Sequence, residues 1–415
     1  MSKSLENILR PFVSYSTHSG AAQGPLAGWS IALKDNIDIA GDVVQIGTRL
    51  FENRRANATA TAAQRLMQAG ATLSGRTQLV ELCFGSWGLN AFTGDAVNPW
   101  DAKVHRAPGG SSAGSAVAVA AGFVRAALGT DTAGSIRMPA ALCGVSGFKP
   151  THGLVPLDGV FPLAPSYDSI GPIAASAADC AQVMAVLAND PSLGTPELLG
   201  TPRIACLPRK SWPVDVEPAV EKAFDDGIRT LKALGFAVNW AEDVPDFQSW
   251  TQHAGVLIAH ECWQVLQPYF ESHPQLLGPG IRQRLENARD LDPELVMAAQ
   301  AARLHAQAVF DTWSSGFDAL LLPTVRCVAP PVVQVRGSNA SLGEFTRWVN
   351  HVAGCALAMP AGFDAQGLPV SLQLVGRGHS DAQVLAIGMA FQTASHWHLR
   401  RPDLENFLSP EWKPS

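Results

Sequence analysis

The 415-residue sequence lacks the motifs that define several classes of metal and cofactor proteins. Its seven cysteines are scattered and never form Cys-x-x-Cys, so structural disulfides and a zinc knuckle are not expected. Its eleven histidines form no His-Glu-x-x-His motif, and neither of the two common glycine-rich phosphate-binding patterns is present. We therefore expect no metal and no cofactor.

Charged residues are also scarce, and they do not cluster in the sequence. Only 16% of the residues are charged, the formal net charge is −6, and no cluster of Lys and Arg stands out, which argues against nucleic-acid binding. No uncharged apolar run reaches the roughly 18–20 residues of a membrane span. Residues 1–12 contain no apolar segment of the kind that a secretory signal needs. These observations predict a cytoplasmic protein that binds neither nucleic acid nor membrane.

Apolar residues are abundant, at 47%, and their pattern alternates between strand and helix. Residues 30–40 are typical of a buried strand and its turn, and residues 59–77 of a helix of about ten residues, a stop at Gly70 and a short strand. Residues 112–121 then predict a helix and residues 123–129 a buried strand. The N-terminal part of the chain therefore has an α/β pattern.

The middle of the chain differs from both ends. Residues 210–315 are mostly helical in pattern, whereas "FDALLLPT" and "GLPVSLQLVG" predict buried strands, separated by "PAGFDAQ". Strands at both ends suggest one shared sheet. We therefore expect a single domain over residues 1–415, with a core at about 24–200 and C-terminal strands within 317–395.

The stretch "APGGSSAGSAVAVAAGF", residues 107–123, holds three serines within five positions. Taken alone, it is typical of a loop that feeds a helix, with Ser111 or Ser112 as the N-cap. "GSSAG" also fits Gly-x-Ser-x-Gly, in which Ser112 would be the nucleophile of an α/β-hydrolase-like esterase. Pro108 and two glycines, however, stand where the preceding strand of such an enzyme should run.

A wider window connects this stretch with Lys34 in "ALKDNID" and Ser135 in "GTDTAGSIRMPA". Together with "YDSIGPIA" and "MPAGFDAQGLPVSLQLVGR", these segments resemble the amidase signature family of serine hydrolases over residues 24–395. The resemblance implies an α/β fold with a central mixed, twisted β-sheet covered by helices on both faces. It also implies a Ser–Ser–Lys triad without histidine.

The resemblance assigns the nucleophile to Ser135, the base to Lys34 and the relay to Ser111, whose preceding peptide bond is cis in the family. A lysine is a base only when it is neutral, and the apolar neighbours of Lys34 are consistent with the burial that lowers a lysine pKa. Backbone N–H groups of the turn after the strand would form the oxyanion hole. These donors are Thr132, Ala133, Gly134 and Ser135.

Two positions depart from the family pattern, because Ala113 and Ala133 stand where glycine is usual. Alanine keeps the N–H donor but resists a positive φ, so the turn must allow it. Asp131 and Arg137 are expected to pin the loop by hydrogen bonds and an ion pair.

The segment "VELCFGSWG", residues 80–88, would lie beside the scissile bond in the family. The expected substrate-binding residues are therefore Cys83, Phe84, Gly85 and Trp87. Four aromatic residues are candidates either for a pocket wall or for core packing, namely Trp87, Phe161, Phe345 and Trp348.

The resemblance favours a free-standing enzyme that hydrolyses a small amide to a carboxylate and ammonia or an amine, through a Ser135 acyl-enzyme. Carbamates, ureas and esters remain alternative substrates, and a degenerate amidase that serves as a non-catalytic subunit is a further alternative. The glutaminase subunit of tRNA-dependent amidotransferases typically carries a GSSTEN-like run where this chain has "GSWGLN", and it is longer. Dimers are frequent in the family, which favours a homodimer.

Overall fold

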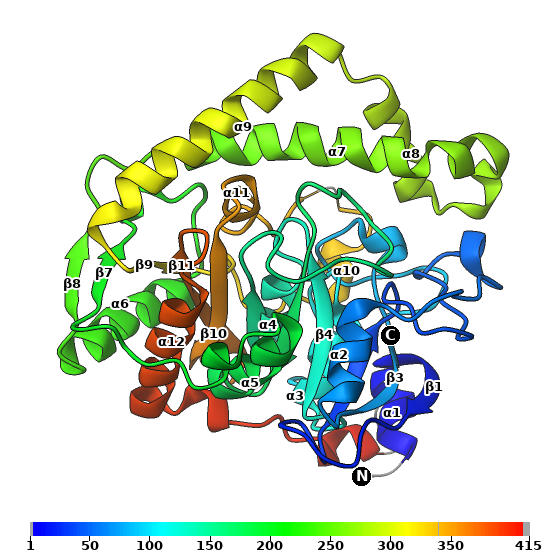
Figure 1. Cartoon of the computed structure of the whole chain (residues 1–415), viewed down its shortest axis with the longest axis horizontal. Helices are drawn as coiled ribbons and strands as arrows, with labels where there is room; N and C mark the ends of the chain where they lie inside the picture. Colours follow the sequence, from blue (N-terminus) through cyan, green and yellow to red (C-terminus); the bar gives the residue numbers. More distant parts are fainter. Residues whose placement is uncertain (1–2, 339, 410–415) are drawn as a thin grey trace.

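The computed structural model describes residues 3–338 and 340–409, and its centre is a mixed β-sheet (Figure 1). The eleven strands lie in the order β1-β3-β2-β4-β6-β5-β10-β11-β9-β7-β8. Both ends of the chain supply strands, and β5 pairs with β10 near the centre of the sheet. The strands are β1 (Phe12–His18), β2 (Ser30–Lys34), β3 (Thr72–Thr77), β4 (Ala126–Asp131), β5 (Ser146–Lys149), β6 (Ser169–Ala174), β7 (Arg203–Cys206), β8 (Ala237–Trp240), β9 (Ala319–Pro323), β10 (Cys355–Phe363) and β11 (Pro369–Gly376).

Helices cover both faces of this sheet, as the sequence predicted. The helices are α1 (Lys3–Leu9), α2 (Thr61–Gln68), α3 (Ala113–Ala120), α4 (Arg137–Cys143), α5 (Ala177–Leu187), α6 (Pro218–Ala233), α7 (Phe247–Ser272), α8 (Pro279–Arg289), α9 (Pro293–Trp313), α10 (Val332–Val335), α11 (Arg347–His351) and α12 (Asp381–Ser395).

Alternation along the strands explains why both faces are apolar. Side chains of successive strand residues point to opposite faces. Ile31 and Leu33 of β2 share one core with α2, α5, α6 and α12, whereas Ala32 between them packs with α3 and α4. The strands are therefore buried on both sides, which accounts for their almost continuous apolar sequences.

Three long helices, α7, α8 and α9, form a separate layer at the top of the view in Figure 1, next to α11. Asp246 caps α7 by accepting a hydrogen bond from Ser249 N, at 2.9 Å. Asp292 caps α9 in the same way through Glu294 N, and a proline occupies the first turn. Among the described residues, no helix is long and apolar enough to cross a membrane.

One strand differs from the sequence prediction. The segment "PAGFDAQ" was expected to separate two strands, but its first four residues are the end of β10. Pro360 and Gly362 resemble strand breakers locally, yet both neighbours of β10 pair with it, and a register shift between Pro360 and Gly362 accommodates them. Tertiary pairing therefore outweighs local propensity here.

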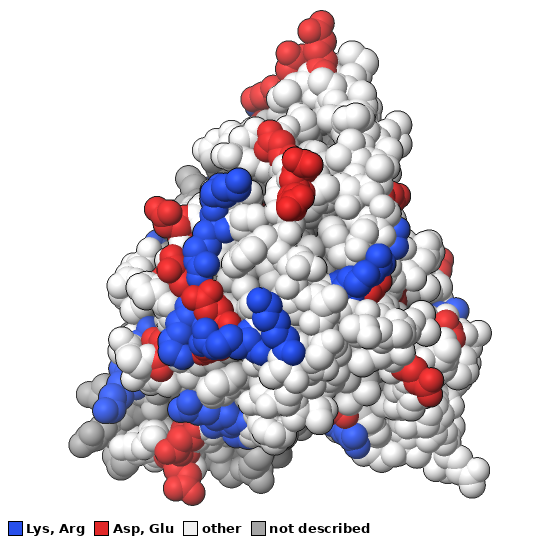
Figure 2. Space-filling model, turned by 90° about the vertical axis from the view of Figure 1, so that its left-hand side faces the viewer, with Lys and Arg blue, Asp and Glu red and all other residues white. Residues whose placement is uncertain are grey.

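Charged side chains are interspersed on the face shown in Figure 2, where Lys and Arg lie beside Asp and Glu. Ion pairs at the protein surface include Arg203–Asp318 and Arg209–Asp225. Exposed pairs of this kind contribute only about 0–1 kcal/mol each.

Candidate active site

Lys34 is the last residue of β2, and its side chain is fully buried. Its Nζ donates hydrogen bonds to Ser111 Oγ at 2.7 Å and to Thr130 Oγ1 at 2.8 Å. Burial lowers the pKa of Lys34 from its ordinary value, against the opposing effects of Cys83 and Asp168. The amine is therefore held between two hydroxyls in an environment that favours its neutral form.

Ser111 follows a cis peptide bond with Gly110, as the family resemblance implied. Gly110 is required by close packing, because an added Cβ would lie 2.8 Å from both Gly88 N and a methyl group of Val80. The short helix α3 begins two residues after Ser111.

The other two serines of the stretch face the sheet. Ser112 stands at the N-cap position of α3 but makes no capping hydrogen bond, and its hydroxyl donates to Thr130 O at 3.3 Å. Ser115 donates to Leu128 O at 2.9 Å. Both side chains are fully buried, so they tie α3 to β4 instead of facing a substrate.

Ser135 lies on the turn between β4 and α4 and opens into a cavity of about 280 Å³. Thr132 and Ala133 of the same turn line this cavity, as do Cys83 and Phe84 from the loop after β3. Burial keeps the Cys83 thiol protonated by raising its pKa. Ser135 is thus the one of the three predicted triad residues that a ligand in the cavity would meet.

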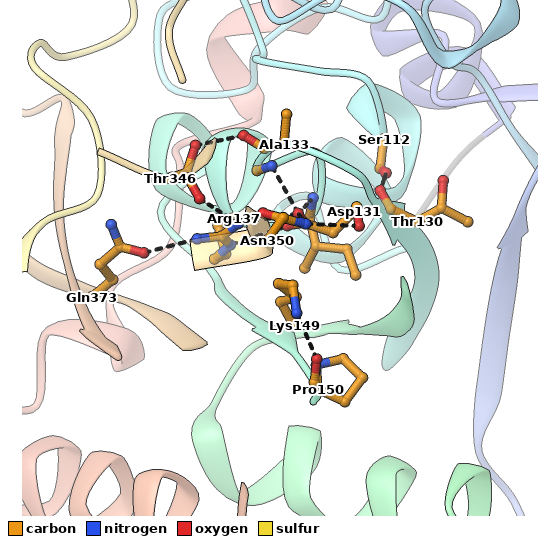
Figure 3. Close-up of polar contacts among 12 residues, drawn as sticks. Ser112, Thr130, Asp131, Ala133, Arg137, Lys149, Pro150, Thr346, Asn350 and Gln373 are labelled. Atoms are coloured by element: carbon orange, nitrogen blue, oxygen red, sulfur yellow. Dashed lines mark hydrogen bonds and ion pairs between the residues drawn. The ribbon is translucent and has the colours of Figure 1, made fainter. Parts of the chain in front are cut away.

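A buried network holds this turn (Figure 3). Asp131 accepts hydrogen bonds from Gly134 N at 2.7 Å and Ile136 N at 3.2 Å, and Arg137 forms a fully buried ion pair with it. Asn350 Nδ2 donates to the same carboxylate at 2.9 Å. Although burial opposes ionisation, Arg137, the positive charge of Lys149 and the hydrogen bond from Asn350 lower the pKa of Asp131 to about 2. The expected pinning role of Asp131 and Arg137 is confirmed.

This network shows which of the four predicted oxyanion donors have a free N–H group. Because Gly134 N–H already donates to Asp131, it is occupied in the structure. The N–H groups of Thr132, Ala133 and Ser135 have no acceptor among the described residues. Neither Ala113 nor Ala133 has a positive φ, so alanine fits both positions that departed from the family pattern.

The predicted substrate residues divide into two groups. Cys83, Phe84 and Gly85 line the cavity with Ser135, but Trp87 lies in an adjoining pocket, where its indole donates to Ala340 O at 2.8 Å.

The remaining aromatic candidates belong to the core. Phe345 and Trp348 are buried, and Trp348 stacks on Phe247 with ring centroids 4.0 Å apart. Phe161 packs edge-on against Phe51 and does not line the cavity. Of the two roles that the sequence left open for these three aromatic residues, the structure favours core packing, because none of them lines the cavity.

Several cavity residues have no counterpart in the sequence prediction. Gly255 and Ile258 come from α7, Arg284 from α8, and Arg347 begins α11. They lie in the helical middle and near residue 345, where no motif marks them.

Asp168 belongs to the motif "YDSIGPIA", although the sequence alone gives it no role. It accepts hydrogen bonds from Thr132 Oγ1 at 2.5 Å and Leu163 N at 2.9 Å, directly behind the turn. Burial raises the pKa of Asp168 to about 6. The motif is the signal that could have identified it. In the part of the chain that the structure describes, no cluster of His, Cys, Asp and Glu could hold a metal ion.

Comparison with known proteins shows which family this chain resembles. The family described as Amidase matches residues 13–385. A glutamyl-tRNA(Gln) amidotransferase subunit from Chloroflexus aggregans is 35% identical over 93% of this chain and 86% of the relative.

Solved structures similar to this chain belong to amidases as well. A crystal structure of an amidase has a TM-score of 0.81 and 31% identity, covering 89% of this chain and 85% of that chain. The peptide amidase of Stenotrophomonas maltophilia has a TM-score of 0.77 and 26% identity, covering 96% and 91%. The chain belongs to the amidase signature family. It is an enzyme that hydrolyses amides.

Proposed function

We propose that this chain hydrolyses a small-molecule amide to a carboxylate and ammonia or an amine, with Ser135 as nucleophile, Ser111 as relay and Lys34 as base. The observation that carries this proposal is the 2.7 Å contact between Lys34 Nζ and Ser111 Oγ, fully buried beside the cavity into which Ser135 opens. A serine hydroxyl is a weak nucleophile until a base takes its proton. Burial of Lys34 supplies that base.

The proposed reaction begins when neutral Lys34 accepts the Ser111 proton and Ser111 accepts the proton of Ser135. Ser135 Oγ then bonds to the amide carbon, and the oxyanion is stabilised by the N–H groups of Thr132, Ala133 and Ser135. The C–N bond breaks as the proton returns along the relay to the leaving nitrogen, which leaves an ester on Ser135. Water attacks this ester, releases the carboxylate and restores the serine.

The test is a comparison of Ser135→Ala with Ser112→Ala, a change at a second buried serine, next to the start of α3. We expect Ser135→Ala to lose both amide hydrolysis and labelling by a fluorophosphonate probe, while Ser112→Ala keeps both. The reverse result would assign the nucleophile to Ser112 and reject the scheme. Absence of labelling in the wild-type protein would support the non-catalytic alternative.

A second candidate is a glutaminase that supplies ammonia to a partner enzyme, as the 35% identity to an amidotransferase subunit suggests. The run "GSWGLN" differs from the GSSTEN-like run typical of such glutaminases, and its Trp87 is anchored to Ala340 O. Ammonia release from glutamine, compared with simple aliphatic and aryl amides, distinguishes the two candidates. Ureas, carbamates and esters in the same panel test the alternative bonds.

A further inference from the structure

The cavity into which Ser135 opens carries charge of one sign only. Arg284 of α8 and Arg347 of α11 both line it, and no Asp or Glu is present among the described residues of its wall. Its volume of about 280 Å³ is near the lower end of ligand pockets, so both guanidinium groups border one small space.

Neither arginine has a carboxylate partner among the described residues. Arg284 donates from Nη1 to Phe84 O and lies over the Phe84 ring, 4.9 Å from its centroid. Arg347 donates from Nη2 to Ser341 Oγ at 3.0 Å. Within residues 3–338 and 340–409, no Asp or Glu oxygen lies within 4.0 Å of either guanidinium.

Two fully buried arginines of this protein are, in contrast, paired. Arg76 contacts Asp35 at 2.6 Å, and Arg137 contacts Asp131 at 3.1 Å. The carboxylate nearest in sequence to Arg347 belongs to Glu344, and it is held by Arg326 at 2.5 Å. The fold therefore pairs the buried guanidinium groups of Arg76 and Arg137 with carboxylates, whereas the two at the cavity form no ion pair with a described carboxylate.

The two guanidinium groups also oppose each other. Burial lowers the pKa of Arg347, and the charge of Arg284 lowers it further, against the attraction of Glu344. Burial likewise lowers the pKa of Arg284. Guanidinium groups nevertheless stay protonated in proteins. Two positive charges that lack an ion-pair partner at one partly buried cavity are unfavourable unless a bound anion compensates them.

We propose that Arg284 and Arg347 bind a carboxylate of the substrate, so that the preferred substrates are small amides that carry a carboxylate and no ammonium group. This inference rests on the proposed function for the reaction itself and names its substrate class. The carboxylate stands on the acyl part, as in the half-amide of a dicarboxylic acid, or on the amine part, as in an N-acyl amino acid. Planar guanidinium groups match a carboxylate in charge and in geometry.

The same cavity disfavours free glutamine. Glutamine carries an ammonium group beside its carboxylate, and the described wall offers no carboxylate to pair with it. Its deaminated analogue glutaramate has the same amide and carboxylate without the ammonium group. Comparison of these two compounds separates an anion site from a site built for an amino acid.

The experiment measures kcat/KM for matched pairs in which a methyl group replaces the carboxylate. One pair is glutaramate and pentanamide, and the other is N-acetylglycine and N-ethylacetamide. We expect the wild-type enzyme to prefer the anionic member of at least one pair by about tenfold or more, mainly through KM, because charge-assisted hydrogen bonds form in the ground state too. We also expect glutaramate to be hydrolysed faster than glutamine.

Variants assign the preference to the two arginines. Arg284→Gln and Arg347→Gln should each reduce the anionic-to-neutral ratio of kcat/KM by about tenfold, since each removes one charged donor. Arg347→Lys keeps the charge and should retain part of the ratio. The matched control is Arg282→Gln, a change at an exposed arginine of the same helix α8, which should leave the ratio unchanged.

A binding measurement keeps this inference separate from the proposed function. Glutarate, the expected product from glutaramate, is titrated into the wild type and the variants by calorimetry, and each arginine variant should weaken binding by about tenfold. Labelled enzyme with a ratio near one and no arginine-dependent glutarate binding would overturn the anion site and leave the amidase proposal intact. Arginine-dependent binding of glutarate without probe labelling or hydrolysis would support the anion site and overturn the amidase proposal.

Discussion

Two parts of the cavity are built in contrasting ways. The serine floor consists of the 131–137 turn, which carries Ser135, and of Lys34 and Ser111, which are buried behind the cavity. The arginine wall consists of Gly255, Ile258, Arg284, Ala340, Ser341, Gly343 and Arg347. In the floor, Lys34 and Arg137 are fully buried and hydrogen bonded to neighbouring side chains. In the wall, both arginines are partly exposed and have no carboxylate partner in the described chain.

The serine floor and the arginine wall therefore serve two different tasks, catalysis and substrate selection. A floor whose buried charged side chains are hydrogen bonded holds a fixed geometry before any substrate arrives, which is the preorganisation that catalysis requires. A wall with unpaired charge obtains its partner from the ligand, so it contributes to selection. Changes in the floor should therefore abolish reaction or unfold the protein, whereas changes in the wall should alter which amide is hydrolysed.

The largest expected effect is at the base of the floor. Lys34→Met should reduce kcat/KM for any accepted amide by about 10²–10⁴-fold, because the proton of the nucleophile then has no acceptor. The exposed Lys210→Met is the matched control and should be neutral. A Lys34→Met enzyme with near wild-type activity would show that the buried contact with Ser111 is structural only.

The pH dependence of the wild-type enzyme tests the same residue. Below the pKa of Lys34 the amine is protonated and cannot accept a proton, so kcat/KM should rise with pH on the acidic limb. Because burial lowers this pKa, the rise should be complete below the ordinary lysine value of 10.5. A profile of kcat/KM that falls with rising pH over this limb would contradict the assignment of Lys34 as base.

The next effect is on stability. Arg137→Met should cost about 3–5 kcal/mol of unfolding free energy, because it leaves the Asp131 carboxylate buried without its ion-pair partner. The control is Arg203→Met, which breaks the exposed Arg203–Asp318 pair and should cost about 1 kcal/mol or less. Denaturant unfolding measures both. Equal costs would show that burial does not distinguish the floor from the surface.

A smaller effect is expected at Gly134, whose φ is +121°. An added Cβ would lie 2.1 Å from Thr346 Oγ1, which itself donates to Ala133 O. Gly134→Ala should therefore cost about 1–3 kcal/mol and reduce activity, since the turn must shift. Gly280→Ala on α8 meets no atom within 4 Å and should change stability by about 1 kcal/mol or less. Unfolding curves of the two variants show whether an added methyl group destabilises the serine floor more than it destabilises α8.

Much of the fold was predictable because its signals are local. The pattern of residues 30–40 predicted the strand β2, and the helical pattern of residues 210–315 predicted helices such as α6. β10 was partly missed because Pro360 and Gly362 look like breakers until their pairing partners are known. The role of the aromatic candidates stayed open for a similar reason, since the stacking of Trp348 on Phe247 joins residues far apart in the sequence.

The sequence by itself determined the family and which residues are proposed for the serine floor, because Lys34, Ser111 and Ser135 lie in short, recognisable runs whose residue types are specific. Only the tertiary structure decided the arginine wall. Arg284 reaches Phe84 O across 200 positions of the chain, and Arg347 reaches the same cavity from α11. Such contacts arise when α7, α8 and α11 pack over the sheet, and no local pattern encodes which arginine then remains without an anion.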